Sequence, residues 1–169
     1  NLGIMYYLGE GIKKNSKEAA KWFTLAAEQG HKEAQCNLGI MYYKGTGVEK
    51  DHRAAVKWFQ HSADLGDTLA QYNLGVMYCR GESVLQNFVI AYKWFILSNS
   101  SVEKVYHLRF IRFMEQRMEV SQIEKAQEMA RNWKPKQFKQ AKIKWWFWLL
   151  LTIFCFGIWF AHQSIHQMR

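Results

Sequence analysis

A seven-residue pattern, Asn-Leu-Gly-(Ile/Val)-Met-Tyr-(Tyr/Cys), occurs three times in this chain, beginning at Asn1, Asn37 and Asn73. The copies are 36 residues apart, and a loop glycine, an alanine and a Trp-Phe pair return at the same spacing between them. A fixed period of about 20–50 residues is typical of a solenoid of stacked supersecondary units. Because each unit of a solenoid offers its surface to neighbours and partners, the repeat argues against a globular enzyme with one active site.

The second copy is complete and predicts two helices joined by a short loop. Apolar or small residues recur at helical spacing over Lys32–Lys44, and Gly45 follows where a left-handed C-cap suits glycine. A second helix is expected over about Asp51–Leu65, with Asp51 as its N-cap and Gly66 after its end. The equivalent N-cap residues of the other copies are Asn15 and Asn87.

Aromatic residues and one glycine in each copy predict how the two helices pack. Ala55, Trp58, Phe59 and Ser62 share one side of the second helix, and we expect them to form inter-helix core rather than a cofactor site. Gly39 lies inside the first helix, where glycine costs about 1 kcal/mol relative to alanine. Its return in every copy predicts a close approach of the paired helices that a side chain would prevent.

These residues resemble the Sel-one-like repeat (SLR) family, which is related to the tetratricopeptide repeats. The resemblance covers residues 1–102, with the first repeat truncated, and implies an all-α fold: an α-solenoid of helix-turn-helix repeats in a right-handed superhelix. The third copy departs from the family pattern at Ser83 and over 99–101, as repeats near the end of an array do. The residues of the second copy that match the family pattern are Ala34, Leu38, Gly39, Met41, Tyr42, Gly45, Gly47, Val48, Asp51, Ala55, Trp58, Ala63 and Gly66.

Residues 103–133 predict a pair of capping helices that shield the last repeat from water. Ser121 and Glu124 have the spacing of a capping box at the start of the second of these helices, and Lys134-Pro135 ends it. The run Gln-Ile-x-x-Ala-Gln-x-x-Ala-Arg-x-Trp is similar to the closing helices of bacterial members of the family. The two core-facing stripes are expected at Val105, Leu108, Ile111 and Met114, and at Ile123, Ala126, Ala130 and Trp133.

The end of the chain predicts a membrane anchor. Residues 134–144 form a basic linker with five lysines, and no acidic residue follows Glu128. Residues 145–161 are apolar on all sides and would span about 26 Å as a helix, which is long enough for a short transmembrane helix. Tryptophans near both ends suit the membrane interfaces. The alternative is a buried core helix, but a capped solenoid offers nothing to cover it. Residues 162–169 would form a short tail on the far side.

The charges around this apolar segment predict its orientation. Five lysines precede it and only Arg169 follows, so the repeats are expected on the cytoplasmic side. The resemblance to eukaryotic members with a C-terminal span implies the opposite, lumenal side, and a signal sequence ahead of residue 1 would override the charge rule. We expect the chain to be a fragment, since it does not begin with Met and starts inside a repeat helix.

Several kinds of chemistry find no support in the sequence. The net charge is +9, but residues 1–102 carry 11 basic and 9 acidic side chains, which argues against a nucleic-acid-binding face on the repeats. No phosphate-binding loop, metal-spaced cysteine cluster or nucleophile elbow occurs, so we expect no catalytic residue, cofactor or metal. The three cysteines, Cys36, Cys79 and Cys155, show no pairing pattern, which favours a reducing compartment.

The histidines fit no metal site either. His162 and His166 could share a helix face but lack a third ligand. We expect the others to be solvated surface residues; they are His31, His52, His61 and His107.

These observations predict a membrane-anchored protein-interaction scaffold that binds a protein or extended peptide. The alternatives are a regulatory adaptor in a membrane-bound quality-control or signalling complex, and the non-catalytic part of an enzyme whose catalytic domain precedes residue 1. The oligomeric state stays open.

The resemblance to tetratricopeptide repeats implies that the first helices line a concave face and that the asparagine before each Leu-Gly pair points into it. Asn1 begins this row of amides, which can donate to and accept from an extended backbone. Ile40 and Val76 lie one turn further along this face and would add apolar contact, and the basic residues Lys44 and Arg80 lie two turns along and favour a segment with acidic or C-terminal carboxylate groups. The alternative is that the asparagines only bond neighbouring helices. The predicted concave face comprises Asn37, Ile40, Tyr43, Lys44, Asn73, Val76 and Arg80.

Overall fold

The computed structural model describes residues 2–98 and 104–137. The chain divides into one unit of residues 1–138 and another of 139–169, and the second lies outside the described residues. The predicted membrane helix 145–161 and tail 162–169 therefore lie outside them as well, as does most of the basic linker. The described residues contain eight helices and no strand: α1 (Leu2–Leu8), α2 (Ser16–Glu28), α3 (Lys32–Lys44), α4 (His52–Asp64), α5 (Thr68–Arg80), α6 (Phe88–Ser98), α7 (Lys104–Glu115) and α8 (Val120–Arg131).

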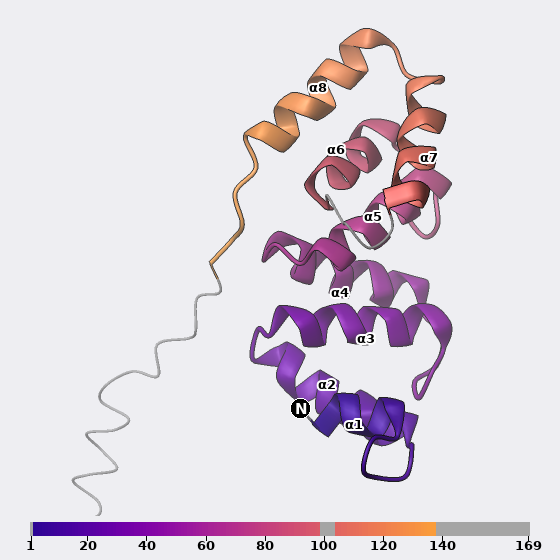
Figure 1. Cartoon of the computed structure of the whole chain (residues 1–169), viewed down its shortest axis with the longest axis vertical. Helices are drawn as coiled ribbons and strands as arrows, with labels where there is room; N and C mark the ends of the chain where they lie inside the picture. Colours follow the sequence, from indigo (N-terminus) through magenta and orange to yellow (C-terminus); the bar gives the residue numbers. More distant parts are fainter. Residues whose placement is uncertain (1, 99–103, 138–169) are drawn as a thin grey trace, which may run out of the picture. The chain divides into compact units, whose positions relative to one another are not determined.

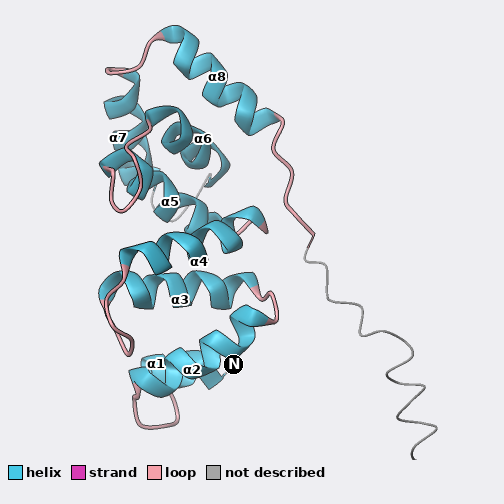
Figure 2. Cartoon of the chain, turned by 180° about the vertical axis from the view of Figure 1, so that it is seen from behind, coloured by secondary structure: helices cyan, strands magenta, loops and turns pink. Residues whose placement is uncertain are grey.

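Helices α1 to α6 form three hairpins that stack one on the next (Figure 1). Within a hairpin α1 packs on α2, α3 on α4 and α5 on α6; between hairpins α2 packs on α3 and α4 on α5. The view from behind shows the same order of helices (Figure 2). The predicted all-α solenoid of helix-turn-helix repeats is confirmed for this part of the chain, while the handedness of its superhelix stays a prediction.

Local signals in the sequence explain where these helices begin and end. Asp51 accepts hydrogen bonds from the backbone N–H groups of Arg53 and Ala54 at 2.8 and 3.0 Å, which confirms it as the N-cap of α4. Gly45 ends α3 in the left-handed conformation with φ of 70°, where a side chain would be strained. The two other predicted N-caps, Asn15 and Asn87, also accept hydrogen bonds from the starts of their helices.

The predicted close approach at Gly39 is confirmed. A Cβ at this position would lie 2.7 Å from two ring carbons of Phe59, well inside van der Waals contact. The first and second helices of the repeat therefore touch through a glycine on α3 and a phenylalanine on α4. The same pairing recurs between Gly3 and Phe23, and between Gly75 and Phe95.

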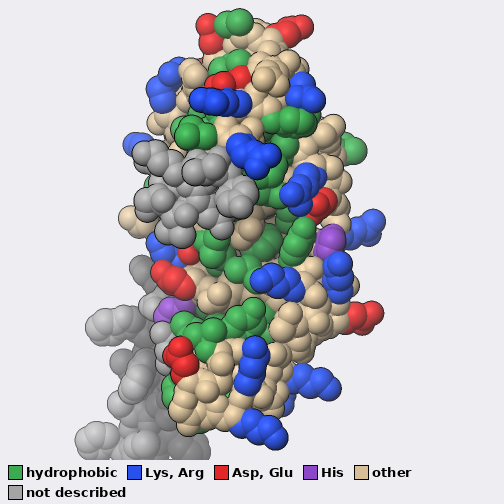
Figure 3. All heavy atoms as spheres, turned by 45° about the vertical axis from the view of Figure 1, so that its right-hand side comes forward, with side chains coloured by type: hydrophobic (Ala, Val, Ile, Leu, Met, Phe, Trp, Pro, Cys, Tyr) green, Lys and Arg blue, Asp and Glu red, His purple; other side chains and the backbone are tan. Residues whose placement is uncertain are grey.

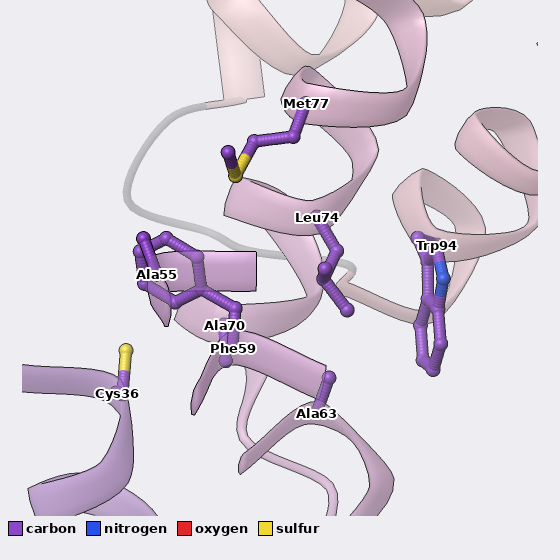
Figure 4. Close-up of a cluster of buried hydrophobic side chains, with 8 residues drawn as sticks. All are labelled: Cys36, Ala55, Phe59, Ala63, Ala70, Leu74, Met77 and Trp94. Atoms are coloured by element: carbon purple, nitrogen blue, oxygen red, sulfur yellow. The ribbon is translucent and has the colours of Figure 1, made fainter. Parts of the chain in front are cut away.

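The core lies between successive hairpins and is made of small and aromatic residues. In one cluster the end of the Met77 side chain points toward the ring of Phe59 (Figure 4), and both side chains are buried together with Leu74. Trp58 differs from expectation: it is only partly buried and packs on the preceding cluster of α2 and α3. The ring buried between α3 and α4 is that of Phe59. Gly39 on α3 lies opposite Phe59 and leaves room for its ring, and among the described residues Trp58 has no such glycine opposite it.

The cap consists of two helices, as predicted, but they do not form a hairpin. Helix α8 packs along α6, whereas α7 contacts α5 and α6 and barely contacts α8. Ala126 and Ala130 of α8 are buried as expected. The predicted capping box is wrong, because α8 begins at Val120 and places Ser121 inside the helix. Gln122 instead accepts a hydrogen bond from the backbone N–H of Glu119.

The core-facing side of α7 is rotated relative to the prediction. Met114 is fully buried, as expected, but Leu108 is 46% exposed. Phe110 takes the inward position and stacks on Phe95 of α6, with 5.2 Å between ring centroids. An aromatic ring that can stack on another thus displaces the leucine predicted from helical spacing alone. The side chain of Val105 lies outside the described residues.

The first residues of the basic linker fold back onto the second repeat. The backbone N–H of Lys136 donates to the carbonyl of Asp64, and its ammonium group lies 2.7 Å from the Asp64 carboxylate. Trp133 meets Trp94 edge to face at 6.3 Å and packs near Gly66. These contacts tie the start of the linker to the C-terminal end of α4.

Candidate functional site: the face of the first helices

A cavity opens between the first helices α3 and α5 of neighbouring repeats. We call it the central cavity, and its volume is about 210 Å³. It gathers four of the seven residues predicted from the sequence, and these come from two neighbouring repeats. Its lining residues are Tyr43, Phe59, Tyr72, Asn73, Val76, Met77, Arg80 and Phe110.

The other three predicted residues lie elsewhere. Asn37 lines a separate cavity of about 570 Å³, one repeat earlier, together with Leu2 and Trp22. Ile40 is partly buried and packs against the core cluster of α4 and α5. Lys44 is exposed at the end of α3 and lines neither cavity. The predicted face is thus a row of two cavities rather than one continuous set of contacts.

The two asparagines have amides available to a ligand. Asn37 and Asn73 are partly buried, yet neither side chain forms a hydrogen bond with another part of the chain that the structure describes. The bonds between neighbouring helices there come instead from glutamines: Gln35 donates to the carbonyl of Ala27, and Gln71 does the equivalent one repeat later. Asn1, the first of the predicted row, lies outside the described residues.

Glu82 joins two residues of the central cavity. The Tyr43 hydroxyl donates to Oε2 of Glu82 at 2.9 Å, and a guanidinium nitrogen of Arg80 lies 3.3 Å from Oε1. This hydrogen bond is the main reason why the pKa of Tyr43 is raised, with burial adding to the effect. The pair with Arg80 is open to water, since the two side chains are 52% and 26% exposed. Glu82 lies in a loop and was missed by reasoning that followed the helices.

Tyr43 also contacts a histidine through ring stacking. The ring of His52 stacks on that of Tyr43 at 4.8 Å and an interplanar angle of 16°. His52 is therefore not the solvated surface residue that we expected, and its Nε2 is buried without a hydrogen-bond partner in the described structure. His31 and His61 are exposed, as predicted, and the side chain of His107 lies outside the described residues.

A further cavity adjoins the central one on its C-terminal side. We call it the α5–α7 cavity; its volume is about 570 Å³, and it shares Arg80 and Phe110 with the central cavity. The Arg80 guanidinium lies 5.9 Å from the centre of the Phe110 ring. Sequence reasoning missed this cavity because α7 has no repeat signature to align. Its lining residues are Cys79, Arg80, Gln86, Arg109, Phe110 and Phe113.

The side chains that line these cavities suit hydrogen bonding and apolar contact. They offer amides, a phenol, arginines and aromatic rings, which hydrogen-bond and contact a ligand. Cys36 and Cys79 are buried and free, and burial raises the pKa of both thiols, so they stay protonated. Among residues 2–98 and 104–137 there is no cluster of three metal-ligating side chains. Nor does that part of the chain contain a helix with the length and hydropathy of a membrane span.

Comparison with known proteins agrees with the geometry. The Sel1 repeat family model matches residues 1–31, 32–67 and 68–100. The chain is similar to the crystal structure of a protective antigen present in uropathogenic Escherichia coli strains that displays an SLR fold. That similarity has 27% identity and a TM-score of 0.70, and covers 85% of this chain and 34% of the antigen, so this chain spans about a third of its length.

A Sel1 repeat protein from Oxalobacter formigenes is also similar, with 25% identity and a TM-score of 0.58 over 79% of this chain and 68% of that one. No match was found among curated proteins.

Proposed function

The chain belongs to the Sel1 repeat family, and we propose that it is a non-catalytic interaction scaffold that binds an extended acidic peptide segment along α3 and α5. The observation that carries this proposal is the central cavity, where the unbonded amide of Asn73 lies beside Tyr43 and Arg80. A side-chain amide can donate to and accept from a peptide backbone without reading its sequence. Asn37 offers the same group one repeat earlier.

Charge favours an acidic segment. Arg80 and Lys44 end α5 and α3, so the second and third repeats each place one cation at the same end of the first helix. The ion pair of Arg80 with Glu82 is solvent-exposed, and such pairs contribute about 0–1 kcal/mol. An incoming carboxylate can therefore replace Glu82 at little cost.

The test is binding of a dye-labelled, Glu-rich, unstructured peptide, followed by fluorescence anisotropy. The double variant Asn37→Ala with Asn73→Ala should weaken binding about tenfold, since each lost amide removes hydrogen bonds of about 0.5–1.5 kcal/mol. Asn132→Ala, at the exposed C-terminal end of α8, is the matched control and should bind like wild type.

Thermal unfolding of the same proteins separates binding from folding. The double variant should melt within a few degrees of wild type. A large drop in melting temperature, or unchanged peptide affinity, would show that the asparagines do not serve the ligand.

We also propose that residues 145–161 anchor the scaffold in a membrane with the repeats on the cytoplasmic side. The support is the length of the apolar run and the five lysines before it. The protein should stay in the membrane fraction after alkaline carbonate extraction, and deletion of 145–169 should release it. Protease added to intact cells should spare the repeats and protease added to inverted vesicles should digest them; the reverse pattern would contradict the orientation.

A further inference from the structure

The α5–α7 cavity combines an apolar wall with unpaired positive charge. Phe110 and Phe113 of α7 form the wall opposite the end of α5. Its volume of about 570 Å³ lies within the usual range for ligand pockets, about 300–1,000 Å³. The face of the molecule seen in Figure 3 likewise shows apolar side chains between Lys and Arg side chains. The cavity is thus suited to a ligand that is partly apolar and partly anionic.

Three arginines surround this cavity. Arg80 and Arg109 line it, and Arg117 lies over the Phe113 ring at 3.7 Å. Cys79 lies in the cavity wall, and burial raises the pKa of its thiol. The positive charges of Arg80 and Arg117 act on the same thiol and oppose that rise. Glu82 is paired with Arg80, whereas Arg109 forms no ion pair within residues 2–98 and 104–137. An anionic group entering the cavity would therefore meet uncompensated positive charge.

The aromatic rings cannot serve as stacking platforms for nucleic-acid bases. The Phe110 ring stacks on Phe95 and has the Arg80 guanidinium near its face. The Phe113 ring has the Arg117 guanidinium over its face and meets Phe88 in an edge-to-face contact. Binding of single-stranded nucleic acid relies on free aromatic faces. The occupant is better matched by a peptide side chain that fills the space between these rings than by a base that must lie flat on one.

We propose that the α5–α7 cavity is a specificity pocket that takes a large apolar side chain of the bound segment and, beside it, an acidic residue held by Arg80 and Arg109. This inference rests on the proposed function, because the pocket adjoins the central cavity through Arg80 and Phe110. It adds the cap helix α7 to the binding surface. It also gives the partner a chemical signature: an extended segment with an acidic residue next to a large apolar one.

Glu82 acts in this arrangement as an internal competitor. Its carboxylate occupies Arg80 and the Tyr43 hydroxyl in the unbound protein. A ligand carboxylate reaching Arg80 must displace it. Removal of its charge by Glu82→Gln should therefore strengthen binding of an acidic ligand about threefold, the effect of an exposed ion pair.

The experiment compares four dye-labelled Gly/Ser peptides with a central Glu-Phe, Gln-Phe, Glu-Ser or Gln-Ser pair. Fluorescence anisotropy should show the tightest binding for Glu-Phe. Arg109→Gln should weaken that peptide about tenfold, as loss of a charge-assisted contact does, and reduce its preference over Gln-Phe by a similar factor, since Arg80 remains. Phe113→Ala should weaken it about fivefold and abolish its preference over Glu-Ser. Arg112→Gln is the control: it removes the same charge from the same helix at an exposed position outside both cavities.

The outcomes distinguish binding in the α5–α7 cavity from binding at the central cavity. If peptide binding depends on Asn73 but is unaffected by Arg109→Gln and Phe113→Ala, the proposed specificity pocket is wrong, and the proposed binding along α3 and α5 at the central cavity is retained. If none of the four peptides binds the wild-type protein, the pocket proposal fails together with the acidic-segment ligand of the proposed function. If a single-stranded RNA binds more tightly than Glu-Phe and loses affinity in Arg109→Gln, the site takes nucleic acid and the inference is overturned.

Discussion

Gly39→Ala is the sharpest test of how the repeat is held together. The added Cβ would lie 2.7 Å from Cδ1 and Cε1 of Phe59, whereas carbon atoms in contact normally stay about 3.5–4.0 Å apart. Phe59 is 2% exposed, so its ring cannot move into solvent. Overpacking of a close-packed core costs about 1–3 kcal/mol. Alanine recovers about 1 kcal/mol through its helix propensity. A net loss of about 0–2 kcal/mol in the free energy of unfolding is therefore expected, in place of the gain that helix propensity alone would give.

Urea denaturation followed by far-UV circular dichroism measures this loss, with an unchanged m-value as the sign that the unfolding reaction is the same. Gly75→Ala is the matched control, because its Cβ would lie 3.1 Å from Phe95 and needs a smaller adjustment. The loss should be smaller there. Phe59→Leu should relieve the clash. The double variant Gly39→Ala with Phe59→Leu should therefore lose less free energy of unfolding than the sum of the losses of the two single variants. A Gly39→Ala protein that is more stable than wild type by about 1 kcal/mol, the gain that helix propensity alone would give, would refute the close contact between α3 and α4.

Three further predictions follow from the packing and the ionisable groups. Phe59→Ala should lower the free energy of unfolding by about 3–5 kcal/mol and Trp58→Ala by clearly less, as measured in urea; equal losses would contradict the assigned burial. Burial, helped by a hydrogen bond to a carboxylate on α7, raises the pKa of Tyr92 to about 12. The unfolded chain then loses this proton first, so stability should fall by about 2 kcal/mol between pH 10 and 12, and Tyr92→Phe should remove that fall. Asp64→Asn should change global stability by no more than about 1 kcal/mol but speed tryptic cleavage at Lys136, which unchanged cleavage would contradict.

The repeated part of the fold could be predicted closely because each signal occurs in several copies. A glycine such as Gly39 costs helix stability in isolation, so its return at every 36-residue step pointed to a packing contact, and the structure shows that contact. The start of α4 at Asp51 and the end of α3 at Gly45 could be predicted because helix capping depends on the residue at the helix end itself. By contrast Trp58 and Phe59 are adjacent large aromatics, and only the position of the opposing glycine decides which is buried.

The cap and much of the candidate site could not be predicted in the same way. Helix α7 occurs once, so helical spacing alone could not show that Phe110 faces the core while Leu108 is exposed. Glu82 reaches Tyr43 across 39 positions of sequence, and no local pattern signals such a contact. The α5–α7 cavity depends on how α7 crosses the end of α5. These features follow from tertiary packing of non-repeated segments.

The side-chain amide signals of the asparagines give the most direct measurement of the central claim. A chain labelled with ¹⁵N-asparagine and titrated with the Glu-Phe peptide would report each amide separately by NMR, with single Asn→Ala variants as assignments. We expect the NH₂ signal of Asn73 to shift most, that of Asn37 to shift when the peptide is long enough to reach it, and that of Asn132 to stay unchanged. A titration in which the side-chain NH₂ signal of Asn132 or of the N-cap Asn15 shifts, while that of Asn73 does not, would contradict binding along the first helices.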